Sequence, residues 1–185
     1  MNNKIQVLLN SNAKVYSGYG LKIRIMRKDD IPSVVKWRND NRVKKFMGNT
    51  ESQNLITMKF WFNKITREHS CLPFIIENNE ESIGFLELKN FEVYGPHSCE
   101  QGIFLNPDYI GKGLMKSINF VLEEILSELE INDLIGVIRK DNFRNRHIWE
   151  KTGAELIKED DEFCTYIYRK ENRLNNMACQ KSQLS

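Results

Sequence analysis

Two glycines flank a lysine directly before a long amphipathic run. The segment covers residues 106–126, and its glycines are Gly111 and Gly113. Glycines ahead of a helix let another molecule approach the backbone, and the free N–H groups of a helix start bind anions such as pyrophosphate. The alternative interpretation is a loop that only turns the chain.

Two known phosphate-binding patterns fail at this loop. A P-loop needs Ser or Thr after its Gly-Lys pair, but Lys112 is followed by Gly113. A dinucleotide fingerprint needs a third glycine where the chain has Lys116. What remains is a strand, a short glycine loop and a helix whose first amides would hold an anion.

Composition excludes several classes of function. The chain has 185 residues, 41% of them hydrophobic, and a net charge of +2, which predicts one core and no basic face for nucleic acid. Its four cysteines lack C-x-x-C spacing, and no apolar run approaches the ~18 residues of a membrane span. We therefore expect a cytoplasmic protein with reduced thiols, no metal site, no nucleic-acid partner and no membrane span.

The elements that position this loop are N-terminal helices on a mainly antiparallel sheet, followed by a strand–helix–strand–helix–strand unit. Hydrophobic periodicity predicts strands over 21–27, 72–78, 81–90, 99–106, 133–140, 154–160 and 162–170, and helices over 31–40, 41–47, 54–65, 114–129 and 143–153. In the longest helix we expect an apolar face opposite a polar side that includes Glu123. The fold class is α+β in one domain over 21–170, after an N-terminal extension (1–20) and before a polar tail (171–185) that frays.

Three motifs in order carry a family resemblance. They are Trp37-Arg38-Asn39 at the end of the first helix, the run from Asp108 to Gly113, and the run from Asn142 to Gly153. Together they resemble the GNAT acetyl-CoA-dependent N-acetyltransferases over about residues 20–170, especially the RimJ/RimL-like branch and the amino-sugar acetyltransferases. The resemblance implies a mostly antiparallel, twisted sheet with splayed central strands and flanking helices.

The resemblance also implies where coenzyme A binds. Its pantetheine arm would pair with the backbone near Ile103 and Leu105, and Asn142 would hydrogen-bond the same arm. Arg144 would meet a phosphate, although a solvated arginine is the alternative. The pyrophosphate would rest on the N–H groups of the glycine loop and helix start, which are those of Ile110, Gly111, Lys112, Gly113, Leu114 and Met115.

Two residues depart from the family pattern. Asp108 stands where Gln or Arg is usual, and places a carboxylate near the expected phosphates. Trp149 replaces the tyrosine that often protonates the leaving thiolate, and an indole N–H has no usable acidity. Tyr166 and Tyr168 are possible substitutes, with core or surface tyrosines as the alternative.

The implied catalyst is a carboxylate, because the acceptor ammonium must lose a proton before it attacks. Glu100, at the start of the cofactor strand, matches the position where many family members place one, and Glu87 is the second candidate. A surface glutamate is the alternative interpretation of Glu100.

The acceptor is expected from resemblance to transferases that acetylate nucleotide-linked 4-amino-4,6-dideoxy sugars of surface glycans or flagellin. Arg38 and Asn39 would face the sugar or nucleotide, and Trp37 or Trp61 would stack on a base. The alternative places Trp37 in the core and leaves Arg38 solvated. A RimJ/RimL-like protein N-terminal acetyltransferase and a non-catalytic acyl-CoA-binding module are the alternatives. The oligomeric state stays open, and a homodimer is possible.

Overall fold

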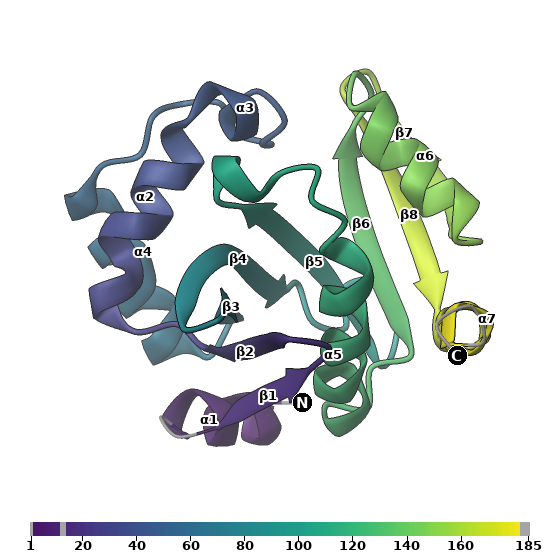
Figure 1. The fold of residues 1–185 in the computed structure, drawn as a ribbon, viewed down its shortest axis with the longest axis horizontal. Helices are drawn as coiled ribbons and strands as arrows, with labels where there is room; N and C mark the ends of the chain where they lie inside the picture. The colour runs from purple at the N-terminus through teal and green to yellow at the C-terminus, as the bar shows by residue number, and fades with distance from the viewer. Residues whose placement is uncertain (1, 12–13, 182–185) are drawn as a thin grey trace.

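The computed structural model describes residues 2–11 and 14–181 as an α/β fold built on one twisted sheet (Figure 1). Its strands lie in the order β1-β2-β3-β4-β5-β6-β8-β7, and neighbours are antiparallel except β5 and β6. This confirms the expected mixed, mostly antiparallel sheet.

The element bounds follow the sequence pattern closely. The strands are β1 (Val15–Gly18), β2 (Leu21–Ile25), β3 (Cys71–Asn78), β4 (Glu81–Lys89), β5 (Ser98–Leu105), β6 (Asp133–Arg139), β7 (Glu155–Glu159) and β8 (Phe163–Arg169). The helices are α1 (Asn2–Asn10), α2 (Ile31–Asn39), α3 (Asn41–Lys44), α4 (Leu55–Glu68), α5 (Met115–Glu128), α6 (Phe143–Lys151) and α7 (Lys170–Lys181), with short 3₁₀ turns η1 (Lys28–Asp30) and η2 (Pro107–Tyr109).

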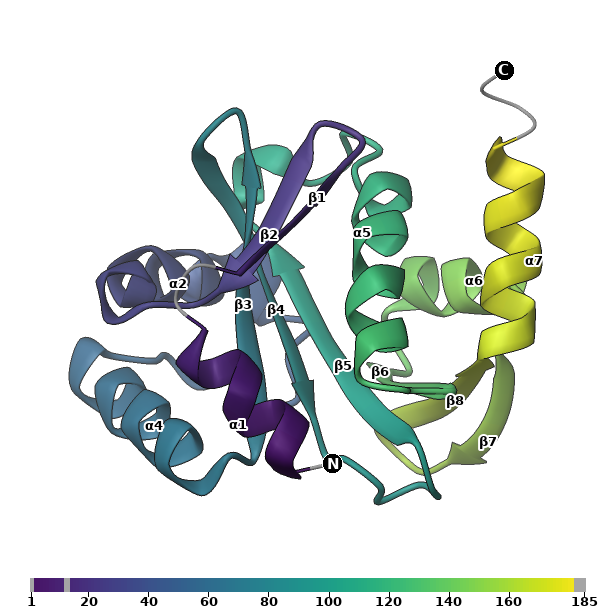
Figure 2. The same cartoon turned by 90° about the horizontal axis from the view of Figure 1, so that it is seen from below.

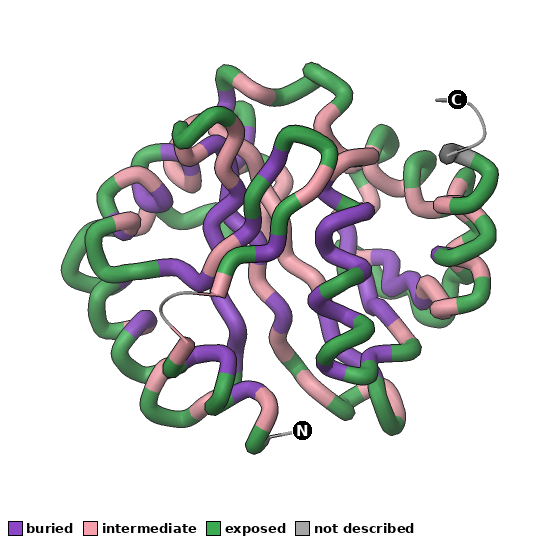
Figure 3. Tube along the Cα trace, turned by 60° about the horizontal axis from the view of Figure 1, so that its bottom comes forward, coloured by how far each residue is buried: buried purple, intermediate pink, exposed green. Residues whose placement is uncertain are grey.

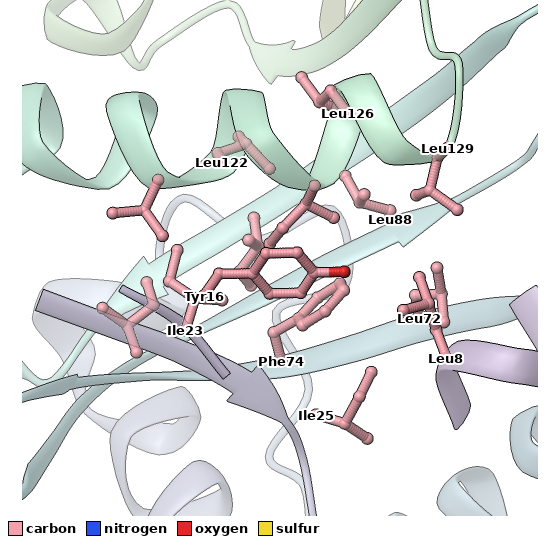
Figure 4. Packing of buried hydrophobic residues seen from close by; sticks show 14 of the residues in the cluster. Leu8, Tyr16, Ile23, Ile25, Leu72, Phe74, Leu88, Leu122, Leu126 and Leu129 are labelled. Carbon is pink, nitrogen blue, oxygen red and sulfur yellow. The ribbon is translucent and has the colours of Figure 1, made fainter. Parts of the chain in front are cut away.

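Side chains alternate between two faces of the sheet, and helices cover both (Figure 2). On one face α1 and α5 pack over residues such as Ile23, Phe74 and Leu88 to form the main core (Figure 4). On the other face α2 and α4 cover Ile75 and Phe85. The buried residues therefore follow the central strands and the inner side of α5 (Figure 3).

The two central parallel strands separate after a short paired stretch. β5 and β6 pair only at Ser98–Asp133, Cys99–Leu134 and Glu100–Ile135, although β5 continues to Leu105. Beyond Glu100, no strand within residues 2–11 and 14–181 pairs with the edge of β5 that faces β6. The expected splay of the central strands is confirmed.

Both ends of the chain hold more structure than the sequence pattern predicts. Residues 2–10 and 15–18 form α1 and β1, and Ile5 and Leu8 of α1 are buried in the main core. The expectation of a frayed tail is wrong for residues 171–181. They belong to helix α7, which directly follows β8 in the chain. The assignment of Glu123 to the polar side of α5 is also wrong, because α7 covers it and Arg173 pairs with it at 2.8 Å. Residues 182–185 of the expected tail lie outside the described residues.

Within residues 2–11 and 14–181, no helix combines the length and the apolar composition needed to cross a bilayer.

Candidate active site

A cavity of about 790 Å³ runs through the opening between β5 and β6 and reaches both faces of the sheet. Leu122 and Leu134 line it on the α5 face, and Phe85 lines it on the α2/α4 face. On the α5 face the lining residues run from Met115 to Leu126, which is about 16 Å along a helix axis. Groups bound from opposite faces can therefore meet inside the opening.

The first end of the cavity is the start of α5. Gly111 and Gly113 adopt left-handed backbone angles, with φ of 85° and 76°, and a Cβ at either would meet no atom within 4 Å. Leu114 is the N-cap residue of α5, and its side chain accepts no hydrogen bond. The first N–H groups of α5 are therefore not satisfied by a capping side chain. This start is built to offer backbone N–H groups to an anion.

Only part of the loop lines the cavity. Ile110, Gly111 and Met115 line it, whereas Lys112, Gly113 and Leu114 do not. The Lys112 ammonium instead lies 4.3 Å from the centre of the Tyr109 ring. The loop therefore meets the cavity at Ile110, Gly111 and Met115 and not along its whole length.

Asp108 shares a cation of α3 with a second carboxylate. One carboxylate oxygen of Asp108 lies 3.3 Å from the guanidinium of Arg42, which also pairs with Asp40 at 2.9 Å. Asp108 and Arg42 are both mainly exposed, so the pair is screened by solvent. The departure of Asp108 from the family pattern thus places a paired carboxylate beside the loop.

β5 and α6 supply the walls along the opening. Ile103 and Leu105 lie on the part of β5 that β6 leaves unpaired, and both line the cavity. Asn142 and Arg144 line it from the start of α6. The Asn142 Oδ1 accepts a hydrogen bond from the Asn145 N–H at 3.2 Å, so this residue also caps α6.

Trp149 fills the position where a tyrosine was expected. Its indole packs against Gly136 of β6, where an added Cβ would come within 2.5 Å of the ring. Tyr168 packs beside it, with the ring centroids 6.2 Å apart, and lines the cavity. The Asn176 amide donates to the Tyr168 hydroxyl at 2.9 Å, and burial raises the pKa of Tyr168. Tyr166 instead donates to Glu150 at 2.5 Å and does not line the cavity.

A charged cluster lies on the α2/α4 face of the opening. Glu100 is the last residue of β5 paired with β6, is only 9% exposed, and accepts from the Asn90 amide at 2.8 Å. Glu87 lies opposite Gly102, where a Cβ would come within 2.7 Å of the Glu87 carboxylate. The missing side chain at Gly102 thus leaves room for this second carboxylate at the opening.

Lys89 links the two carboxylates, and the sequence analysis missed it. Its ammonium lies 2.6 Å from Glu87 and 3.5 Å from Glu100. Burial opposes the charge of Lys89, but Glu87 and then Glu100 raise its pKa above the ordinary lysine value. The available signal was the alternation of β4, which puts positions 87 and 89 on one face.

Arg38 brings an incompletely bonded guanidinium to the same cavity. Its Nη2 donates to the Asn49 carbonyl, whereas its Nη1 is buried and, in the part of the chain that the structure describes, has no hydrogen-bond partner. Burial lowers the pKa of Arg38, and the Glu87 charge opposes that change. A buried N–H group without an acceptor lowers the stability of the protein, and a ligand that accepts a hydrogen bond from it removes this penalty.

Two further expected acceptor residues have different surroundings. Trp61 lines the cavity and packs edge-on against Phe85, with ring centroids 6.2 Å apart. Asn39 does not line the cavity, because its amide bonds both the N–H and the carbonyl of Gln53, at 2.8 and 2.7 Å. Asn39 therefore holds the loop before α4 in place.

Comparison with known proteins agrees with this geometry. Residues 21–155 match the acetyltransferase (GNAT) domain family, which is more than half of the chain. The chain belongs to the GNAT acetyltransferase family, and acetyl-CoA is the acetyl donor of that family. The expected family, enzyme class and donor are thereby confirmed.

Individual relatives are distant in sequence but close in fold. The acetyltransferase PseH of Campylobacter jejuni is 23% identical over 138 residues, which are 75% of this chain and 85% of that protein. A structure of Vibrio cholerae spermidine N-acetyltransferase in complex with CoA and spermine aligns with a TM-score of 0.74 at 18% identity, over 85% of this chain and all of that one. Apo FdhC, a nucleotide-linked sugar GNAT, aligns with a TM-score of 0.73 at 21% identity, over 92% and 96% of the two chains.

Proposed function

We propose that this GNAT enzyme transfers the acetyl group of acetyl-CoA to the primary amine of a nucleotide-linked amino sugar. The observation that carries this proposal is a single cavity that crosses the sheet, with an uncapped helix start at one end and the incompletely bonded Arg38 at the other. The donor enters from the α5 face and the acceptor from the α2/α4 face.

The residues that hold the donor are backbone groups along a continuous path. The N–H groups of Gly111 and of Gly113 to Met115 bind the pyrophosphate, because those of Ile110 and Lys112 already donate to the carbonyls of Pro107 and Tyr109. Arg144 adds a cation nearby. The free edge of β5 at Ile103 and Leu105 pairs with the pantetheine arm as an added strand would, and Asn142 supports the arm from α6. The donor supplies an acetyl group activated as a thioester.

Glu100 is the general base of the proposed reaction. Its carboxylate takes a proton from the acceptor ammonium, and the free amine attacks the carbonyl carbon inside the opening. A backbone N–H of β5 stabilises the developing oxyanion. Collapse of this tetrahedral intermediate breaks the C–S bond and expels the thiolate. The second proton lost by the nitrogen passes to that thiolate or to solvent, because the Trp149 indole is no proton donor.

The charges around the acceptor end favour an anionic acceptor over a polyamine. Lys89 pairs with both carboxylates, Glu87 and Glu100, and Arg42 pairs with Asp40 and Asp108, whereas Arg38 keeps an incompletely bonded guanidinium. A spermidine-like cation would offer that buried N–H group no acceptor and would add a like charge beside it. The phosphates of a nucleotide sugar would instead accept from Arg38, and Trp61 offers a face for the base.

The test is release of thiol from acetyl-CoA with a panel of acceptors: UDP- and dTDP-4-amino-4,6-dideoxy sugars, N-terminal peptides and spermidine. We expect rapid release with a nucleotide sugar and little with the others. Release with peptides would favour the RimJ/RimL-like alternative. Binding of acetyl-CoA without release on any acceptor would favour the non-catalytic module.

The variant Arg38→Ala tests whether the acceptor carries a phosphate that binds Arg38. The change removes the proposed phosphate contact, so KM for the nucleotide sugar rises about 10- to 100-fold while KM for acetyl-CoA stays near its original value. Arg27→Ala is a matched control, because Arg27 is exposed and does not line the cavity. Equal effects of the two changes would contradict the proposed contact.

A further inference from the structure

The cavity continues past the point where β5 and β6 come together. Leu134 pairs with Cys99 on the closed side of the opening, and Tyr168 pairs with Leu134 on the next strand. Both Leu134 and Tyr168 line the cavity. On the α5 face there is therefore space beyond the position where a thioester can be attacked from the other face.

Side chains from five elements enclose this space. We call it the α7 recess and define it by Leu122, Leu126, Leu134, Trp149, Tyr168 and Met177, which all line the cavity. The three leucines expose only 2%, 1% and 3% of their surface, so the half-buried Trp149, Tyr168 and Met177 supply most of the accessible surface of the recess. Met177 closes it from α7, the helix that follows β8 in the chain.

The polar groups at the end of the recess bond to the protein itself. Arg173 pairs with Glu123 at 2.8 Å and donates to the carbonyls of Tyr168, Asn132 and Ile131. The Asn176 amide donates to Tyr168, Thr152 and Asn172. Because these donors already have acceptors, an apolar occupant would leave none of them unsatisfied.

We propose that the α7 recess receives the alkyl part of acyl-CoA donors longer than acetyl-CoA, so that this enzyme can also transfer short-chain acyl groups. The inference rests on the proposed position of the donor, and it is independent of the acceptor. The carbonyl carbon stays in the opening, where the amine forms the C–N bond before the C–S bond breaks. The alkyl chain turns from that carbon toward Leu126, Leu134 and Met177.

The experiment measures the equilibrium affinity of the full chain for CoA, acetyl-CoA, butyryl-CoA, hexanoyl-CoA and octanoyl-CoA, without any acceptor. Burial of each methylene in an apolar site tightens binding up to about fourfold. We expect affinity to rise from acetyl-CoA to butyryl- or hexanoyl-CoA and to stop rising when the recess is full. Equal or weaker binding of every longer donor would overturn the inference.

Two tryptophan substitutions on α7 test the location. Met177→Trp fills the recess, so it removes the gain with chain length and leaves acetyl-CoA affinity within about twofold. Leu174→Trp, on the same helix, keeps the gain, because Leu174 is 44% exposed and does not line the cavity. A gain that survives Met177→Trp would contradict the proposed position.

A third variant guards against misfolding. If Met177→Trp does not unfold cooperatively, Leu134→Phe narrows the recess from β6 and carries the same expectation. Failure of acetyl-CoA itself to bind would contradict the proposed function, and with it this inference. Normal acetyl-CoA binding without a chain-length gain would contradict this inference alone.

Discussion

Glu100 lies at the last paired position before β5 and β6 separate, and this position decides what its carboxylate can reach. It points to the α2/α4 face with Asn90 and Lys89 as partners, while the unpaired edge of β5 begins at the next residue. A base here is adjacent to the place where donor and acceptor meet. The same side chain one residue along the strand would face α5.

Replacing Glu100 by Gln removes the proposed base and keeps the shape of the side chain. We expect kcat to fall about 10²- to 10⁴-fold, with little change in the affinity for acetyl-CoA. Steady-state thiol release and equilibrium donor binding measure the two effects. Glu124→Gln, on the exposed side of α5, serves as the control and keeps full activity. A kcat within threefold of the original would remove Glu100 from the proposed mechanism.

The ion pairs of Lys89 contribute to the free energy of unfolding as well as to the charge of the site. Because Glu87 and Glu100 raise its pKa, the stability that it contributes is fully present below the ordinary lysine pKa of 10.5. That contribution is lost as the pH rises through the raised value. Lys89→Met should therefore lower the free energy of unfolding by about 1–3 kcal/mol near neutral pH.

Urea unfolding at pH 7 and above pH 10.5 checks this expectation. The difference in stability between the original protein and Lys89→Met narrows at the higher pH, because the unfolded lysine has then lost its proton and folding must restore the charge of Lys89. Lys36→Met, at an exposed position of α2, gives a small difference at both pH values. A difference for Lys89→Met that is constant with pH would argue against the ion pairs.

At the scale of elements, the loop before α5 depends on backbone conformation. Gly113 has a φ of 76° and open space around its Cβ position, so Ala there brings strain without a clash. We expect Gly113→Ala to shift the N–H groups at the start of α5 and raise KM for acetyl-CoA about tenfold. KM for the acceptor should hardly change, because the acceptor enters from the other face.

A closely matched control exists in the turn between β1 and β2. Gly20 has a φ of 77° and also has no atom within 4 Å of its Cβ position. Gly20→Ala should therefore cost similar stability, measured as Tm, but leave KM for acetyl-CoA unchanged. If both substitutions changed KM equally, the glycine loop would have no special relation to the donor.

At the scale of the whole molecule, α7 is joined to the core by one buried ion pair. Arg173 and Glu123 are 4% and 6% exposed, and their side chains approach to 2.8 Å. Removing one partner leaves a buried charge unpaired, which costs about 3–5 kcal/mol. We therefore expect Arg173→Met and Glu123→Met each to destabilise strongly.

The double variant Arg173→Met with Glu123→Met should recover much of that loss, because apolar side chains of similar volume replace both charges. Denaturant unfolding of the four proteins gives the coupling free energy. If the free-energy losses of the two single variants simply added in the double variant, the two side chains would not stabilise α7 through their ion pair. Thermal unfolding with hexanoyl-CoA and with acetyl-CoA then tests whether these variants keep the proposed gain in affinity with chain length.

Local pattern was sufficient for most elements between β2 and β8. Alternation predicted the half-buried strand at 21–27, and 3.6-residue periodicity predicted α5, because both describe burial of one side only. Local pattern failed at α7, whose sequence is mostly polar. That helix is stabilised by Arg173 reaching Glu123, a contact 50 residues away in the chain. No window of sequence contains both partners.

The candidate site shows the same division. Ile110, Gly111 and Met115 were found from a glycine loop before a helix, and the structure places them on the cavity. Lys89 could not be found in that way. Its role depends on the register that sets it across from Glu100.

The sequence by itself determined the family, the order of the elements and the glycine loop, because motifs and periodicity are local properties of a chain. Only the tertiary structure decided that β5 and β6 part after Glu100, that one cavity crosses the sheet there, and that Arg38, Glu87 and Lys89 gather on one side of it. These features depend on strand register and on side chains that converge from distant elements. Burial and charge at the site follow from that convergence.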